Sequence, residues 1–426
     1  MNKEWFNDIH VGDAREVLED MPSGLADCVV TSPPYWGLRD YGEEGQLGLE
    51  DTPEEYVKRL VDIFKEVKRV LKTSGTLWLN LGDSYFPHDG SRGNKKGGGD
   101  TLKGRDNNYQ PAPKFNSDCG LKAKDLVGIP WRVAFALQED GWYLRNDIIW
   151  MKPNPMPESV KDRCTSSHEH IFLFSKKKRY WFDQDAIREP HKTDLEKEPP
   201  IGGVKHQSNK NATYSGNTPM RISGRNKRDV WKITTKPFAP AHFAVFPPEL
   251  PRTCIKAGCP PKVCLECGKP YERKIEEEYN EEETVEYLKE MGADSNLQYK
   301  GEGKDDESGK AQNPSDLKRR ILDSKRKIKR TVGWEKQCDC STDEVESGVV
   351  LDPFIGAGTT GLIAKQLNRN WIGIDIKEEY REMALERIEK GDKYMRKKER
   401  EKRKKEKMQK NHKSLVEFMD KVGGFS

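Results

Sequence analysis

The stretch Val349–Gly361, VVLDPFIGAGTTG, decides the fold of this chain. A short β-branched run leads into three glycines at G-x-G-x-x-G spacing (Gly356, Gly358 and Gly361), and the apolar segment LIAKQL follows. A strand, a glycine turn and a helix in this order bring the backbone close to a ligand at a helix N-terminus. A tight turn that only packs helix on strand is the alternative. Asp375 ends the next run, WIGID, where an acid is placed to hold ribose hydroxyls, and this favours a nucleoside ligand.

The rest of the predicted sheet must lie before the glycine loop. Only about fifty residues follow Asp375, too few for the second half that a dinucleotide fold requires. The order of the strands is therefore expected to be circularly permuted. The loop lacks the Gly-Lys-Ser/Thr of a Walker site, and Asp352 directly before the glycines would repel a phosphate and suits a cation. S-adenosylmethionine, which carries a sulfonium and an ammonium group, meets these requirements.

Short apolar runs alternate with amphipathic segments elsewhere, which predicts a doubly wound α/β domain with a mostly parallel sheet. Thr52, Pro53 and Glu55 form a capping box with proline at the first helical position, so a helix begins there. The segments HIFLFSK and RYWFD predict an antiparallel hairpin at a sheet edge. The predicted strands are 27–31, 76–81, 147–151, 171–174, 349–351 and 371–376, and further helices are expected over 125–139, 360–368 and 378–388.

Composition and the first residues exclude two classes of protein. No apolar run approaches the roughly 18 residues that span a bilayer, and the opening MNKEWFNDIHVGD lacks the apolar segment of a secretory signal. Nine cysteines, several in close pairs, then indicate thiols or metal ligands in a reducing cytoplasm. Charged residues make up 34% of the 426 residues, too many for one compact core, so solvated insertions or a tail are expected.

A second motif, Ser32-Pro33-Pro34-Tyr35, follows the strand DCVVT. An ordinary proline strand stop is one interpretation, but a rigid turn at this edge of an open α/β sheet also faces the ligand crevice. There the Ser32 hydroxyl and the Pro33 carbonyl can accept hydrogen bonds beside the aromatic face of Tyr35. Methylation of an exocyclic amine needs such acceptors to bind the amino hydrogens and draw the nitrogen toward a tetrahedral geometry, with positioning supplying most of the rate. A base buried in a duplex must also flip out and stack.

Together, TSPPYW and the downstream LDPFIGAGTT resemble the amino-methyltransferases of DNA in their permuted (β) order. The resemblance covers 7–81, 125–183, 231–259 and 349–388, and it implies a class I S-adenosylmethionine-dependent fold. Gly12-Asp13-Ala14 resembles the acid loop near the cofactor adenine, and 246–250 (FPPEL) resembles the segment that closes over the methionine end. The implied catalytic residues are Ser32, Pro33, Pro34 and Tyr35. The implied cofactor-binding residues are Asp13, Phe246, Pro247, Asp352, Pro353, Phe354, Gly356, Gly358, Thr359, Thr360 and Asp375.

The residue before the two prolines indicates which base is methylated. In the family that the motifs resemble, Ser is mostly found in cytosine N4 enzymes and Asp in adenine N6 enzymes, while Asn occurs in enzymes that act on protein glutamine or RNA bases. Ser32 therefore predicts N4 methylation of cytosine in double-stranded DNA, within a restriction–modification or viral self-protection system. Whether a cognate restriction endonuclease is a partner stays open. So do adenine N6 methylation and a catalytically inactive zinc-containing DNA-binding protein. Carbon-5 methylation is excluded, because no cysteine follows a proline.

Two cysteine pairs predict a structural zinc site. Cys264 and Cys267 have the x2 spacing of a zinc knuckle and precede Gly268, and Cys338 and Cys340 form a second close pair. Four thiolates would complete a tetrahedral site, and the metal would stabilise an insertion that has no core of its own. Unligated surface thiols are the alternative, with Cys254 and Cys259 as substitute ligands.

Six segments make up the predicted organisation. Residues 1–191 are the catalytic half, with a mobile loop at 87–124, and 343–390 are the cofactor-binding half, with its preceding segment at 231–259. Residues 192–230 are basic and are the expected target-recognition segment, since basic side chains bind DNA phosphates. Residues 260–342 form the zinc-binding insertion, and 391–426 form a charged tail, expected to be a solvated helix.

Overall fold

The computed structural model describes residues 3–38, 45–86, 119–190, 224–235, 245–279 and 327–423. The chain divides into two compact units. The first comprises Met1–Phe182, Arg228–Pro270 and Cys340–Ser426, and the second comprises Asp183–Lys227 and Tyr271–Asp339. All residues predicted to bind the cofactor or to act in catalysis belong to the first unit.

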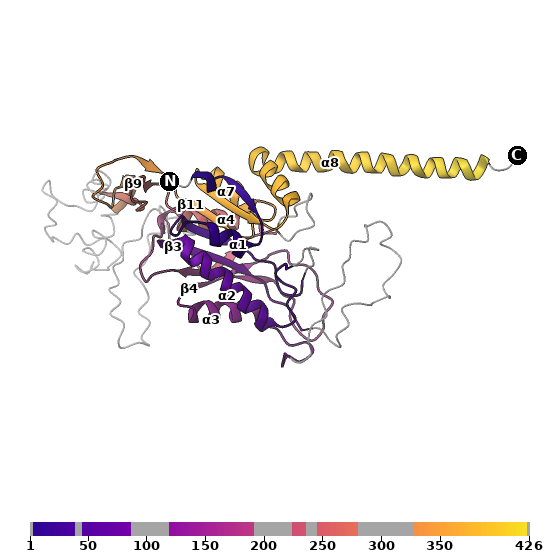
Figure 1. Ribbon diagram of the computed structural model, residues 1–426, viewed down its shortest axis with the longest axis horizontal. Coiled ribbons are helices and arrows are strands. Elements are labelled where there is room, and N and C mark those ends of the chain that lie inside the picture. Colours follow the sequence, from indigo (N-terminus) through magenta and orange to yellow (C-terminus); the bar gives the residue numbers. More distant parts are fainter. Residues whose placement is uncertain are drawn as a thin grey trace, which may run out of the picture. The chain divides into compact units, whose positions relative to one another are not determined.

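An eight-stranded sheet forms the centre of the first unit (Figure 1), in the order β1-β12-β11-β2-β3-β5-β4-β6. Neighbouring strands from β1 to β3 run parallel, β5 is antiparallel to β3 and β4, and β6 is parallel to β4. The prediction of a mostly parallel sheet is confirmed. The strands are β1 (Asp8–Val11), β2 (Ala26–Thr31), β3 (Leu71–Leu81), β4 (Tyr143–Met151), β5 (His168–Ser175), β6 (Val230–Lys232), β11 (Val349–Asp352) and β12 (Asn370–Asp375).

Helices cover both faces of the sheet (Figure 1). On one face α1 (Ala14–Asp20), α2 (Pro53–Val70) and α3 (Ile129–Glu139) pack side by side. On the other face α4 (Glu249–Gly258) contacts β2, β3 and α7 (Thr359–Gln366), and α8 (Glu378–Gly423) packs against α7. Helix α8 has a kink at Gly391, whose φ is 80°. This arrangement is the doubly wound fold that the alternating pattern predicts.

Local sequence explains why α2 forms where it does. The Thr52 side chain accepts a hydrogen bond from the Glu55 amide at 3.2 Å, and Pro53 occupies the start of the helix. Its apolar face is fully buried, and each such side chain contributes about 1.5–3 kcal/mol to stability. The residues of α2 that are 0% exposed are Tyr56, Leu60, Phe64, Val67 and Val70.

Two details of the predicted sheet are wrong. Strand β5 lies between β3 and β4, so it is internal, and the segment 179–183 (RYWFD) forms no strand beside it. The Trp181 amide donates to the Ser74 carbonyl of β3 at 2.8 Å, but no ladder of backbone hydrogen bonds follows. Phe182 instead stacks on Trp78, with ring centroids 6.2 Å apart. The aromatic alternation of this segment therefore serves packing and not strand pairing.

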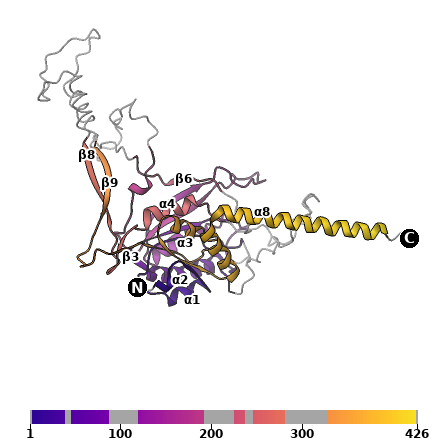
Figure 2. The ribbon, with the colours of Figure 1, turned by 90° about the horizontal axis from the view of Figure 1, so that it is seen from above.

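In the second unit, β8 (Glu272–Tyr279) and β9 (Lys327–Glu335) form an antiparallel two-stranded ribbon (Figure 2). The short 3-10 helix Asp185–Ile187 and an isolated bridge between Glu189 and Arg225 belong to the same unit. The predicted loop at 87–124 lies outside the described residues except for 119–124, and so do 192–223 of the predicted target-recognition segment. Within the described part of the chain, no helix is long and apolar enough to cross a bilayer.

Candidate active site

The parallel strands end together at one edge of the sheet, and both motifs lie there. Strand β2 ends at Thr31, directly before the Ser-Pro-Pro-Tyr turn, and β11 ends at Asp352, directly before the glycine loop. The two strands are paired neighbours, with Val350 opposite Cys28 and Leu351 opposite Val29. Segments that follow adjacent parallel strands lie beside each other, so the fold brings the two motifs together.

Gly356 and Gly358 have left-handed backbones, with φ values of 48° and 75°. A Cβ on Gly356 would meet open space, with only the Phe354 carbonyl oxygen 4.0 Å away. A Cβ on Gly358 would lie 2.9 Å from the Cβ of Ala384 in α8. Gly356 therefore leaves room for a ligand to approach the backbone, whereas Gly358 lets α8 pack against the start of α7.

Asp352 connects the two motifs from inside the protein. Its Oδ1 accepts hydrogen bonds from the Thr31 hydroxyl at 2.6 Å and the Phe354 amide at 3.1 Å, and its Oδ2 accepts from the Thr360 hydroxyl at 2.6 Å. The side chain is 1% exposed, and burial raises the pKa of Asp352 to about 6 in spite of these donors. The carboxylate thus holds the end of β2 against the glycine loop. A contact between Asp352 and a bound cation stays a prediction.

Arg387 of α8 supports the glycine loop, and no sequence motif indicates it. Its Nη1 donates to the Ala357 carbonyl at 2.8 Å and to the Thr359 hydroxyl at 2.9 Å, and its Nε donates to Asp392 at 2.7 Å. Burial lowers the pKa of Arg387, which is 2% exposed. Thr359 and Thr360 are therefore held by interior partners, and their predicted cofactor contacts stay predictions.

Two further acids lie at the same edge of the sheet. Asp375 accepts hydrogen bonds from the Gly356 amide at 3.0 Å and the Lys377 amide at 3.1 Å, and burial raises its pKa to about 6. Asp13 caps α1 by accepting from the amides of Arg15 and Glu16. Because carboxylate oxygens have additional lone pairs, both acids keep the capacity to accept a ribose hydroxyl.

The remaining predicted cofactor residues border the same elements. Pro353 is buried in the glycine loop, and Phe354 is half-buried and packs on the core. Phe246 is half-buried and Pro247 is buried at the entry to α4, where the Pro247 carbonyl accepts from the Leu250 amide at 3.0 Å. Since α4 contacts β2 and α7, this segment is attached to the strand and the helix that flank the two motifs.

The Ser-Pro-Pro-Tyr turn is held at three points. The Tyr56 hydroxyl of α2 donates to the Pro34 carbonyl at 2.8 Å, and the Ser32 hydroxyl donates to the Tyr35 hydroxyl oxygen at 3.2 Å. A Cβ on Gly82 would lie 2.6 Å from Cε2 of Tyr35, so the ring packs closely on the backbone after β3. Ser32 and Tyr35 are half-buried and Pro33 is buried.

Glu169 joins this turn to β3 and β4, and the sequence motifs do not include it. Its Oε2 accepts from the Tyr35 hydroxyl at 2.8 Å and from the Asn80 amide at 3.0 Å, and its Oε1 forms an ion pair with Lys152. Glu169 is the second residue of β5, Asn80 is near the end of β3, and Lys152 follows β4. Burial and the Glu169 charge raise the pKa of Tyr35 well above its usual range.

The four predicted zinc ligands come together. The sulfur atoms of Cys264, Cys267, Cys338 and Cys340 all lie within 4.8 Å of one another. Cys264 is in β7 (Val263–Cys264), which pairs with β10 (Val345–Glu346), and the Gly268 amide closes a turn on the Cys264 carbonyl at 2.9 Å. Four thiolates at such spacing fit a tetrahedral zinc ion. The substitutes considered from the sequence, Cys254 and Cys259, are buried and are not part of this cluster.

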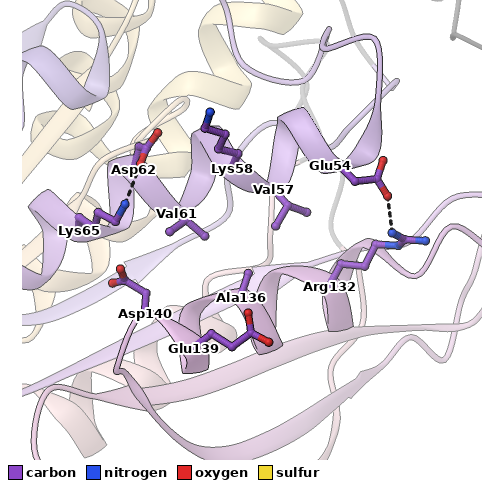
Figure 3. Close-up of a pocket in the computed structure, with 10 residues that line it drawn as sticks. All are labelled: Glu54, Val57, Lys58, Val61, Asp62, Lys65, Arg132, Ala136, Glu139 and Asp140. Carbon is purple, nitrogen blue, oxygen red and sulfur yellow. Dashed lines mark hydrogen bonds and ion pairs between the residues drawn. The ribbon is translucent and has the colours of Figure 1, made fainter. Parts of the chain in front are cut away.

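A surface groove between α2 and α3 contains none of these residues (Figure 3). Val57, Val61 and Ala136 line its floor, and charged side chains surround it. Two of the rim contacts are ion pairs, Arg132 with Glu54 at 2.6 Å and Lys65 with Asp62 at 3.0 Å. The groove lacks the convergent polar groups of a binding site.

Comparison with known proteins identifies the family of this chain. The DNA methylase family of N6 and N4 methyltransferases matches residues 26–263 and 262–386. The type II methyltransferase M.SmaI of Serratia marcescens is 39% identical over 380 residues, covering 89% of this chain and 90% of that protein. M.XycI of Xanthomonas campestris pv. cyanopsidis is 38% identical over 382 residues, covering 89% and 86%. The solved PvuII DNA methyltransferase (cytosine-N4-specific) has a TM-score of 0.44 and 17% identity over 91% of each chain.

The matched residues include both motifs, strands β2 and β11 that carry them, and helices α2, α3, α4 and α7. The resemblance inferred from TSPPYW and LDPFIGAGTT is confirmed. This chain belongs to the N6/N4 DNA methylase family.

Proposed function

We propose that this chain transfers a methyl group from S-adenosylmethionine to the exocyclic N4 amino group of cytosine in double-stranded DNA, after the base has flipped out of the duplex. The observation that carries the proposal is the pairing of β2 with β11, with Thr31 hydrogen-bonded to Asp352 at 2.6 Å. This contact holds the proposed catalytic turn beside the proposed cofactor loop. An enzyme that relies on positioning two reactants needs this fixed relation.

The residues at the sheet edge fit S-adenosylmethionine, which supplies an electrophilic methyl group on a sulfonium when bound. The open side of Gly356 admits the ligand to the backbone. Asp375 and Asp13 keep acceptor capacity for the ribose and adenine end. Phe354 and Phe246 are half-buried and leave aromatic surface available. The buried members of the set, including Asp352 and Thr359, are proposed to act by holding the loop in shape.

Ser32, Pro33 and Tyr35 are proposed to receive the flipped base. The Ser32 hydroxyl and the Pro33 carbonyl accept the two amino hydrogens, so that the nitrogen lone pair is freed from the ring for attack on the methyl carbon. The interaction strengthens only as the nitrogen becomes tetrahedral, so it favours the transition state over the bound base. Tyr35 offers a ring for stacking, worth about 1–3 kcal/mol per base.

The choice of cytosine rests on Ser32. In the family to which the chain belongs, serine before the two prolines is mostly found in cytosine N4 enzymes. Adenine N6 methylation is the alternative on the same scaffold, because adenine also presents an exocyclic amine. The two hypotheses predict different methylated nucleosides, so analysis of the product distinguishes them.

The proposal also covers the strand order, the DNA-recognition segment, the cysteine cluster and the cellular setting. The permuted strand order is supported by β11 and β12, which are late in the chain and lie inside the sheet beside β2 and β1. Residues 192–230 are proposed to recognise the DNA target, and their basic side chains to bind its phosphates. We propose that Cys264, Cys267, Cys338 and Cys340 bind a structural zinc ion. The proposed setting is a cytoplasmic restriction–modification system.

Product analysis tests this function. Purified protein is incubated with tritiated S-adenosylmethionine and unmethylated duplex DNA, and the DNA is digested to nucleosides. The proposal predicts label in N4-methylcytosine. Label in N6-methyladenine supports the alternative base, and DNA binding with no label in any nucleoside would identify an inactive DNA-binding protein.

A further inference from the structure

We infer that Glu169 sets the direction of the hydrogen bonds in the Ser-Pro-Pro-Tyr turn, so that Ser32 faces the target base as an acceptor. The inference deepens the proposed function and rests on it. It starts from a continuous series of contacts: the Ser32 hydroxyl lies 3.2 Å from the Tyr35 hydroxyl, which lies 2.8 Å from a Glu169 oxygen.

The direction of this series follows from the hydrogen atoms available. A carboxylate accepts hydrogen bonds and has no hydrogen to donate. The one hydroxyl hydrogen of Tyr35 must therefore point to Glu169, and the Tyr35 oxygen is left as an acceptor. Ser32 then donates its own hydrogen to Tyr35. The Ser32 oxygen then has only lone pairs to offer to the base. The amino group of the base is a hydrogen-bond donor, so it requires such an acceptor.

The surroundings hold the Glu169 carboxylate in place. Lys152 forms an ion pair with one of its oxygens, and the Asn80 amide donates to the other at 3.0 Å. Asn80 is 2% exposed and also donates to the His170 carbonyl at 3.1 Å, so two acceptors fix the orientation of its amide. Charge-assisted hydrogen bonds of this kind are stronger than neutral ones. The Tyr35 phenol also keeps its hydrogen, because burial and the Glu169 charge raise its pKa well above the usual range.

A reversed direction would give the opposite selectivity. If a donor stood at position 169, Tyr35 could donate to Ser32, and Ser32 would present its hydrogen to the base. Such a site suits the carbonyl oxygen of thymine or uracil and repels the amino hydrogens of cytosine. Glu169 thus acts through Tyr35 as a positioning residue that favours an amino-bearing base.

Single-turnover methyl transfer to plasmid DNA, with a double-mutant cycle, tests this role. Glu169→Gln keeps the shape but supplies a donor, and Tyr35→Phe keeps the ring on Gly82 but breaks the series. Each is expected to lower the transfer rate between about tenfold and about a hundredfold, with little change in the affinity for DNA. In a Ser32→Ala background, Glu169→Gln should lower the rate by less than about twofold, because the oxygen that it orients is absent.

The matched control is Glu66→Gln. Glu66 is half-buried in α2 and forms an ion pair with Arg69 at 2.6 Å, and it lies ten residues along the helix from Tyr56, roughly 15 Å away. Its rate should stay within about twofold of the wild type. Glu169→Gln at the wild-type rate, or an equal loss with and without Ser32, would overturn the inference. If thermal unfolding shows that Glu169→Gln is not folded, the same double-mutant cycle with Tyr35→Phe in its place tests the inference. A wild type that methylates no DNA contradicts the proposed function instead.

Discussion

Asp352 is the residue through which the two motifs depend on each other. Its carboxylate accepts from Thr31 at the end of β2, from Thr360 at the start of α7 and from the Phe354 amide. Removing it would leave the buried Thr31 hydroxyl without this acceptor and leave the Thr360 hydroxyl only the Val30 carbonyl at 3.4 Å, and each buried unsatisfied group costs about 1–3 kcal/mol. The sequence suggested that Asp352 attracts a cation. The structure adds a second role, which is to hold the loop to the strand before the catalytic turn.

The raised pKa of Asp352 predicts a pH-dependent stability difference between the wild type and Asp352→Asn. The folded-state pKa is about 6, above the unfolded value, so the folded wild type binds the proton more tightly. Wild-type stability should therefore fall relative to that of the variant as the pH rises from 4 to 6, by on the order of 1–3 kcal/mol. Chemical denaturation at each pH measures the difference. A difference that stays constant across this window would contradict a buried, titrating Asp352.

At the scale of elements, two glycines of the glycine loop have different structural roles. Gly356 has open space beside it, and Gly358 lies against α8, where a Cβ would be 2.9 Å from that of Ala384. The sequence predicts that the glycines bring the backbone close to a ligand, and the structure adds that a side chain at Gly358 would displace a helix. Both positions also have positive φ, which costs a non-glycine residue roughly 1–2 kcal/mol.

The two substitutions should therefore fail in different ways. Gly358→Ala is expected to lower the free energy of unfolding by more than Gly356→Ala, because it adds a steric clash to the backbone strain. Gly356→Ala should stay folded and bind S-adenosylmethionine more weakly. Chemical denaturation and calorimetric titration with S-adenosylmethionine measure the two effects. Equal losses of stability at both positions would contradict this division.

Elements whose signals are local were predictable, and contacts between distant elements were not. Helix α2 follows from Thr52, Pro53 and an apolar face, all within one segment. The failed strand at 179–183 had the right residues, but β5 already pairs on both sides with β3 and β4. Glu169 meets Tyr35 only because of the strand order, which brings together residues 134 positions apart. Arg387 looks like any basic helix residue until α8 packs on the glycine loop.

At the scale of the whole molecule, the sheet takes strands from both ends of the chain, and the cysteine pairs border a separate ribbon. Cys267 precedes β8 and Cys338 follows β9, so the proposed zinc ligands are at the two points where the chain enters and leaves this ribbon. A metal ion there would join these two points. This is how zinc stabilises small segments that lack a core.

Metal analysis of protein purified without chelator should find about one zinc per chain. Cys267→Ser is expected to lose the metal, whereas Cys164→Ser, an exposed cysteine outside the cluster, should retain it. Chelation should lower the thermal unfolding temperature of the wild type and leave that of Cys267→Ser unchanged. A wild type with no zinc, whose unfolding is insensitive to chelator, would contradict the metal site.

In the proposed mechanism, Ser32 accepts the amino hydrogens of the target base in the transition state. Single-turnover transfer of a tritiated methyl group from S-adenosylmethionine to duplex DNA, compared between the wild type and Ser32→Ala, tests it most directly. Losing one preorganised partner of this kind costs on the order of 10²–10³ in rate. We expect a loss of this size for Ser32→Ala, with the affinities for DNA and S-adenosylmethionine nearly unchanged. Transfer by Ser32→Ala at the wild-type rate would show that the turn is only structural.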